Sequence, residues 1–199
     1  MLKKSLLTAL AIVVVSHVAF AQPTDFGVAR SSRPIRILLG GGASVPVGEF
    51  ADRYDPGYTI HGSLLIRLGS FPINLRTDVN YSRLKLKDLF SPTGETAFAD
   101  DATKMLGGLL NLTLPLGTGP VRFYVMAGVG AINVDPAQFS STSPESSVEF
   151  AINGGGGLQL RLFGLEAFVE ARINNVYTER GIVDTKGISM IPVTFGVIF

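Results

Sequence analysis

The chain has 199 residues, 46% of them hydrophobic, and a formal net charge of +1. The near balance of 17 basic and 16 acidic residues gives no positive excess for a nucleic-acid partner. The absence of cysteine excludes a disulfide framework and a lipidated cysteine, and the length permits a single domain.

Residues 1–21 have the three parts of a secretory signal peptide. Positions 3 and 4 are lysines, positions 6–15 are almost wholly apolar, and the small-x-small sequence at 19–21 supplies a cleavage site. A transmembrane helix is the alternative, but the apolar stretch of 16 residues is shorter than the roughly 20 that span a bilayer. We expect a mature chain from Gln22 with a formal charge of −1, which begins with a flexible periplasmic lead over 22–33.

Beyond the lead, apolar residues recur at every second position in eight stretches, the pattern of β-strands with two different faces. In the first stretch, Ile35 and Ile37 share one face while Arg36 lies on the other. The predicted strands cover residues 35–45, 58–68, 73–82, 106–114, 121–130, 149–161, 165–174 and 188–199. No later run approaches 18 apolar residues, so the chain either packs a sandwich core or faces lipid as a barrel.

The connections between these strands alternate strictly in length. Four are long and polar, at 46–57, 89–102, 135–147 and 179–187, and the three between them are short, at 69–72, 117–120 and 163–164. Transmembrane barrels have short periplasmic turns, long outer loops and an even strand number, whereas a soluble sandwich has no reason to sort its loops by side. We therefore predict an all-β fold, an eight-stranded antiparallel up-and-down transmembrane β-barrel over 34–199.

The last strand ends on an aromatic residue and is apolar on one face. Ile191, Val193, Phe195, Val197 and Phe199 share that face. Such a strand needs a partner on both edges because an open apolar edge invites aggregation, and closure of a barrel supplies both. Pro192 forfeits a ladder hydrogen bond within this strand, which predicts a β-bulge there.

These features together resemble the small eight-stranded outer-membrane β-barrel family typified by OmpX and the barrel domain of OmpA. The resemblance covers residues 35–199 and includes the signal peptide, the glycine-rich first strand, the 169–172 stretch and the terminal Phe199. It implies a monomer in the bacterial outer membrane, in contact with outer-membrane lipid, whose barrel-assembly machinery reads a signal formed by Phe195, Val197 and Phe199. The chain ends at the barrel, so the peptidoglycan-binding domain of full-length OmpA is not expected.

If the apolar faces meet lipid, the opposite faces fill the lumen with charged side chains. The predicted lumen charge network comprises Arg36, Arg67, Arg76, Asp78, Arg122, Glu149, Arg161, Glu166, Glu170 and Arg172. Charges in a narrow barrel must pair, and an eight-stranded barrel encloses only enough room for its own side chains. We therefore expect a structural plug, in which Arg161 and Glu149 are the cross-strand partners within reach of Glu170 and Arg172 if the strand register allows it. A charged pore lining is the alternative.

Aromatic residues fall at two levels of this topology, as in interfacial girdles. The level near the long loops contains Tyr58, Tyr81, Phe150 and Tyr177, and the level near the short turns contains Phe71, Phe123, Phe163, Phe195 and Phe199.

Catalytic chemistry has little support in the sequence. The single histidine of the mature chain, His61, shares a face with Ser63, which resembles the His-x-Ser of outer-membrane lipid A deacylases. Those enzymes need a lipid-facing site and a carboxylate that orients the imidazole, whereas alternation places both residues in the lumen. No helix, metal-ligand spacing or cofactor motif is evident. The leading hypothesis is a non-enzymatic barrel with a structural or surface-interaction role through its loops, and the rivals are a narrow OmpW-like channel and a lipid A-modifying enzyme.

Overall fold

The structure is a computed structural model that describes residues 34–69, 71–87, 102–136, 146–162, 164–177 and 187–199. The predicted signal peptide and periplasmic lead lie outside these ranges, as do Phe163 and most of the loops predicted at 89–102, 135–147 and 179–187.

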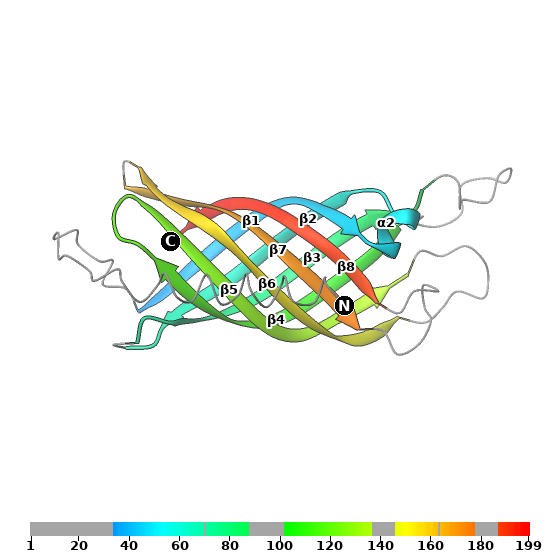
Figure 1. Cartoon of the computed structure of the whole chain (residues 1–199), viewed down its shortest axis with the longest axis horizontal. Coiled ribbons are helices and arrows are strands. Elements are labelled where there is room, and N and C mark those ends of the chain that lie inside the picture. The colour runs from blue at the N-terminus through cyan, green and yellow to red at the C-terminus, as the bar shows by residue number, and fades with distance from the viewer. Residues whose placement is uncertain (1–33, 70, 88–101, 137–145, 163, 178–186) are drawn as a thin grey trace, which may run out of the picture. The chain divides into compact units, whose positions relative to one another are not determined.

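Eight antiparallel strands form a closed barrel in which each strand pairs with the next and the last pairs with the first (Figure 1). The strands are β1 (Ile35–Val47), β2 (Gly57–Arg67), β3 (Asn74–Lys85), β4 (Ala102–Leu116), β5 (Val121–Asp135), β6 (Ser147–Leu162), β7 (Leu165–Tyr177) and β8 (Ile188–Ile198). They contain 11 to 16 residues, and a tilted membrane crossing requires about 9–11. The predicted fold class and strand count are confirmed, but all strands except β8 continue farther toward the long loops than their patterns predicted.

Closure of the barrel continues to the last residue of the chain. Phe199 donates its backbone N–H to the Ile37 carbonyl at 2.8 Å, and Ile37 donates to the Phe199 carbonyl at 3.2 Å. The β1–β8 register runs without a shift from Leu38 opposite Ile198 to Val47 opposite Ser189.

The prediction of a β-bulge at Pro192 is wrong. Pro192 lies opposite Ser44 in an uninterrupted β1–β8 register. The β7–β8 register is also the same on both sides of the proline, and only the pairs that would include Ile191 and Pro192 are missing. The proline therefore interrupts the ladder toward β7 without displacing it, because it lacks the N–H that a ladder bond needs.

The outer wall carries an apolar belt to which all eight strands contribute exposed large hydrophobic side chains. Leu112 on β4 is 54% exposed and Phe195 on β8 is 69% exposed, although both lie within regular strands. An apolar surface that continues around the whole barrel differs from the limited patches of soluble monomers and fits a lipid-facing wall.

Aromatic side chains lie on this outer wall at both predicted levels. Toward the long loops, the rings of Tyr58 and Tyr81 have centroids 6.2 Å apart, and those of Phe150 and Tyr177 are also 6.2 Å apart. The exposed aromatic residues toward the short turns are Phe71, Phe123, Phe195 and Phe199.

The lumen near the long loops holds an apolar core that the sequence interpretation missed. Its residues are Phe50, Tyr54, Leu84, Leu86, Met105, Leu109, Ile132, Val134, Ala151, Val176, Ile188 and Met190. Nine come from six strands, Leu86 directly follows β3, and Phe50 and Tyr54 come from the segment 46–57, which was predicted to be a polar loop. All twelve are buried. This part of the barrel therefore resembles a soluble barrel with a hydrophobic interior.

The segment 46–57 also contains a short helix, α2 (Glu49–Arg53), where no helix was expected. Gly48 precedes it with a φ of 65°, a backbone conformation that glycine adopts without strain. Phe50 and Tyr54 stack at 4.4 Å between ring centroids, and the Thr103 hydroxyl donates to the Tyr54 oxygen at 3.0 Å. These contacts fix α2 to the end of the barrel, where Figure 1 shows it. Within the described ranges, no helix is long and apolar enough to cross a membrane.

Candidate functional site

The inward-facing side chains form four successive groups along the lumen. The short-turn end holds the mouth cluster, defined as Arg36, Arg67, Arg122, Arg161 and Glu166. Next, on four neighbouring strands, comes the inner apolar cluster of Leu38, Leu65, Phe168 and Ile198. The central network of Arg76, Asp78, Glu170 and Arg172 follows, and the apolar core fills the long-loop end.

The central network joins two strands from opposite sides of the barrel. Arg76 on β3 contacts Asp78 Oδ1 through Nε at 2.7 Å and Glu170 Oε2 on β7 through Nη1 at 2.6 Å. Arg172 on β7 contacts Asp78 Oδ2 through Nη1 at 2.8 Å and Glu170 Oε1 through Nε. Each cation therefore contacts both anions, so that the formal charge of the four groups is zero. Ion pairs this well connected offset the desolvation of their charges.

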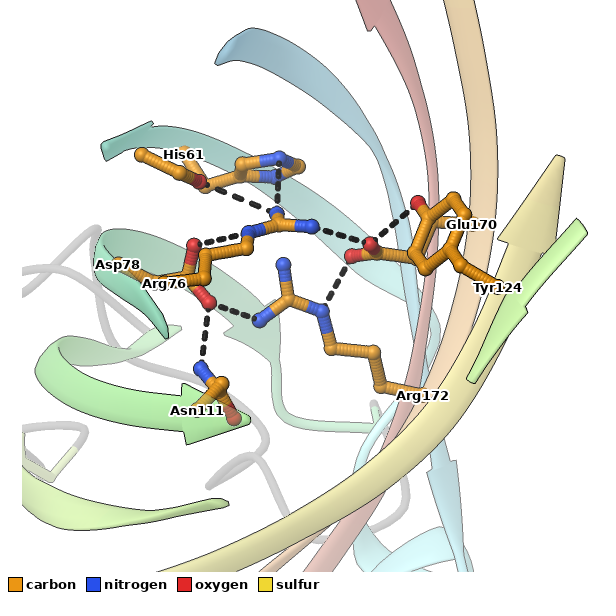
Figure 2. A network of polar contacts seen from close by, with 8 residues as sticks. His61, Arg76, Asp78, Asn111, Tyr124, Glu170 and Arg172 are labelled. Atoms are coloured by element: carbon orange, nitrogen blue, oxygen red, sulfur yellow. Dashed lines mark hydrogen bonds and ion pairs between the residues drawn. The ribbon is translucent and has the colours of Figure 1, made fainter. Parts of the chain in front are cut away.

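Neutral side chains add hydrogen bonds to the central network (Figure 2). The Tyr124 hydroxyl donates to Glu170 Oε2 at 2.6 Å, and the Asn111 amide donates to Asp78 Oδ2 at 2.7 Å. Arg76 donates to the Ser63 hydroxyl through Nη2 at 3.1 Å. All four carboxylate oxygens of the network therefore have a partner, whereas Arg172 Nη2 is buried without a hydrogen-bond partner in the described part of the chain.

Two sequence features create the central network. Arg76 and Asp78 are two residues apart on β3, as are Glu170 and Arg172 on β7, so each pair projects from one face of its strand. The space for them comes from β6, where Gly157 lies opposite Glu170. A Cβ at Gly157 would lie 2.4 Å from the Val169 carbonyl oxygen and 2.6 Å from the Tyr124 hydroxyl oxygen, so a larger residue would displace the β7 backbone or the tyrosine that donates to Glu170.

His61 and Ser63 lie in the lumen, as the alternation predicted. Both are buried, and the ring of His61 lies 5.5 Å from that of Phe168 between centroids. Arg76 Nη2 lies 3.4 Å from His61 Nε2 and also donates to Ser63. A guanidinium cannot act as the carboxylate that orients a catalytic imidazole, because it has no acceptor. The arrangement therefore has the contacts of a structural histidine.

The mouth cluster gathers arginines around one carboxylate. Glu166 on β7 forms ion pairs with Arg36 on β1 and with Arg161, the residue opposite it on β6. Arg122 Nη2 on β5 lies 3.6 Å from Glu166 Oε1. Arg67, at the end of β2, is exposed and lies within electrostatic range of Arg36 and Arg122.

The predicted partners of Glu170 and Arg172 are not those in the structure. Arg161 pairs with Glu166, and Glu149 accepts a hydrogen bond from Ser147 at 2.7 Å. Glu149 lies on β6 eight residues from Gly157, the residue opposite Glu170. That separation corresponds to about 26 Å along a strand, so a contact between Glu149 and the central network is excluded. Sequence reasoning found the inward residues but missed Asn111 and Tyr124 as members of the site.

Within the ranges that the structure describes, no group of three or more His, Asp or Glu residues is arranged to hold a metal ion.

Comparison with known proteins gives a match of fold. No protein-family model matches the chain, and no curated protein matches it. The structure is similar to that of Neisserial surface protein A (NspA), with a TM-score of 0.60 and 14% identity over 83% of this chain and 96% of that chain.

Two further solved structures match less well. The N-terminal β-barrel domain of Pseudomonas aeruginosa OprF has a TM-score of 0.47 and 18% identity over 83% of this chain and 96% of that chain. The attachment invasion locus protein Ail of Yersinia pestis, in complex with the heparin analogue sucrose octasulfate, has a TM-score of 0.38 and 11% identity over 84% of this chain and 100% of that chain. With its closed antiparallel barrel and its likeness to NspA, the chain has the fold of the small eight-stranded outer-membrane β-barrel proteins.

Proposed function

We propose that this protein is a non-enzymatic integral barrel of the bacterial outer membrane, with a closed lumen and a structural or surface-interaction role at its long-loop end. The observation that carries this proposal is the filled lumen. The central network is buried and formally neutral, and the apolar core occupies the bore beyond it.

An outer-membrane location accounts for the outer wall of the barrel. The apolar belt faces lipid, and the aromatic pairs at its edge are suited to the headgroup level. The predicted signal peptide would export the chain to the periplasm. There, the barrel-assembly machinery would recognise Phe195, Val197 and Phe199 at the strand that closes the barrel.

A channel for ions has little support in the lumen. A permeating ion would have to displace side chains of the central network that contact one another across the bore, Arg76 with Glu170 at 2.6 Å and Arg172 with Asp78 at 2.8 Å. It would then have to cross the apolar core, where Met105 and Ile132 are fully buried. A path for hydrophobic solutes would also require that Phe50 and Tyr54 leave the core.

The long-loop end is the part best suited to a surface role. Strands β4, β5 and β6 contain 15 or 16 residues, several more than a membrane crossing needs. The extra length extends the barrel past the aromatic pairs Tyr58–Tyr81 and Phe150–Tyr177 toward the long connections, and the apolar core makes that extension rigid. A rigid base of this kind would hold the long connections at a fixed height above the lipid.

Planar-bilayer recording tests the closed lumen, with the folded state verified on gels. The folded protein should migrate differently on SDS gels before and after boiling, because a barrel without free edges resists detergent. At the protein amount at which a known porin gives steps, this protein should give no stable conductance steps. Stable wild-type steps whose ion selectivity changes in Glu170→Gln would overturn the closed lumen and favour a pore.

A further inference from the structure

The mouth cluster differs from the central network in its balance of charge. The central network has two cations and two anions, whereas the mouth cluster has four arginines and Glu166. Glu166 is the only acidic side chain among the described residues at the short-turn end. The formal excess is therefore three positive charges, concentrated where the lumen opens.

These arginines act on one another electrostatically. Arg36 lies within range of Arg122, Arg161 and Arg67, and Arg122 lies within range of Arg161 and Arg67. The like charges of these arginines repel one another, and the low-dielectric walls of the barrel strengthen the repulsion. The central network cannot compensate because it is already neutral. On β7, the strand that carries members of both groups, Phe168 of the inner apolar cluster lies between Glu166 and Glu170.

The exposure of the cluster increases toward the opening. The side chains of Arg36 and Glu166 are 9% and 11% exposed, Arg122 is 21% exposed, and Arg161 is 29% exposed. The Nε atom of Arg122 is buried and has no hydrogen-bond partner within the described part of the chain. An incoming anion would therefore meet exposed guanidinium groups first and an unsatisfied donor behind them.

We propose that the mouth cluster binds an oxyanion of the phosphate class. Guanidinium groups suit such a ligand because their planar donors match phosphate oxygens in pairs. The ligand would supply the negative charge that Glu166 alone does not provide. Two sources share this chemistry, a free phosphate compound and the phosphodiester headgroup of a lipid.

The test uses the full chain folded in lauryldimethylamine oxide micelles, which contain no phosphate. Calorimetric titration at low ionic strength with pyrophosphate represents the free source, and soluble dihexanoyl phosphatidylglycerol represents the headgroup. We expect saturable binding of at least one probe and no binding of chloride at matched ionic strength. Binding of pyrophosphate alone assigns the free source, and binding of the lipid assigns the headgroup.

Variants connect the binding to the cluster. Arg122→Gln should weaken binding about tenfold or more, the effect of one charge-assisted hydrogen bond. Glu166→Gln should strengthen it, because the competing carboxylate is lost. Arg53→Gln, which removes a cation on α2 at the opposite end, should leave the affinity unchanged.

Gel migration before and after boiling verifies that each variant is folded. The proposal would be overturned if neither probe binds saturably, or if Arg122→Gln and Arg53→Gln have equal effects on binding. Weaker binding in a folded Glu166→Gln would also contradict it, because that variant increases the positive excess.

Discussion

Loss of the Glu170 charge should destabilise the barrel far more than loss of the Glu149 charge. Glu170 is 1% exposed and accepts contacts from Arg76, Arg172 and Tyr124. In Glu170→Gln the two arginines share Asp78 as their only anion, so one positive charge stays buried without compensation. Breaking a buried ion pair from one side costs about 3–5 kcal/mol of stability. Because the amide oxygen of glutamine can still accept from Tyr124, this cost reports the lost charge and not the loss of that hydrogen bond.

Urea unfolding of the folded protein in detergent measures this cost. The chain has no tryptophan, so far-ultraviolet circular dichroism or electrophoretic mobility follows the transition. With a slope of about 2 kcal/mol per molar urea, the expected loss lowers the unfolding midpoint by about 2 M. Glu149→Gln is the matched control: its described partner is Ser147, and one hydrogen bond of this kind contributes about 1 kcal/mol.

A double variant separates charge balance from packing. Adding Arg172→Gln to Glu170→Gln leaves the neutral pair of Arg76 and Asp78, so the combined cost should be smaller than the sum of the single costs. Equal midpoints for Glu170→Gln and Glu149→Gln would refute the reasoning. Additive costs in the double variant would show that the loss arises from something other than the uncompensated charge.

Three other expectations concern separate parts of the barrel. Gly157→Val should lower the unfolding midpoint because its Cβ would clash with the Val169 carbonyl oxygen and the Tyr124 hydroxyl, and an unchanged midpoint would contradict the close packing of that glycine. Deletion of Phe199 should reduce the amount of inserted barrel in membrane fractions more than Phe71→Ala, which changes an exposed aromatic outside the closing strand, and equal yields would argue against the assembly signal. His61→Ala should leave the lipid A of expressing cells unchanged by mass spectrometry, and a lost modification would support the enzyme hypothesis.

The architecture could be predicted because its signals are local. In β3, Val79 and Tyr81 lie on one face, and Asp78 and Asn80 lie on the other. A few residues are therefore enough to show that one face of the strand is apolar and the other polar. The alternation of long and short connections supplied the order of the strands. The effect of proline was less predictable. Pro192 predicted a bulge, but the residues on both sides of it keep the same register.

The members of the site could be predicted better than their partners. Alternation assigns Arg76, Asp78, Glu170 and Arg172 to the lumen, but it does not say which residues meet across the bore. That depends on the stagger between strands, which is fixed only when the barrel closes. Glu149 illustrates the limit, because it shares a face with the lumen residues of β6 but lies too far along the strand to reach Glu170.

The apolar core was missed because inward positions were assumed to be polar along the whole strand. The signal was present: Leu84 has the same parity on β3 as Arg76 and Asp78, and Ile132 and Val134 lie on the inward face of β5. The outward positions beside them turn polar, as at Arg83 and Asn133, so the apolar face changes from outside to inside and the strand has left the regime of polar interior and lipid-facing wall. In this barrel that change occurs toward the long loops, where α2 adds an aromatic pair to the interior. In the closed lumen that we propose, two different barriers would therefore oppose ions: paired charges at the centre and hydrocarbon packing at the long-loop end.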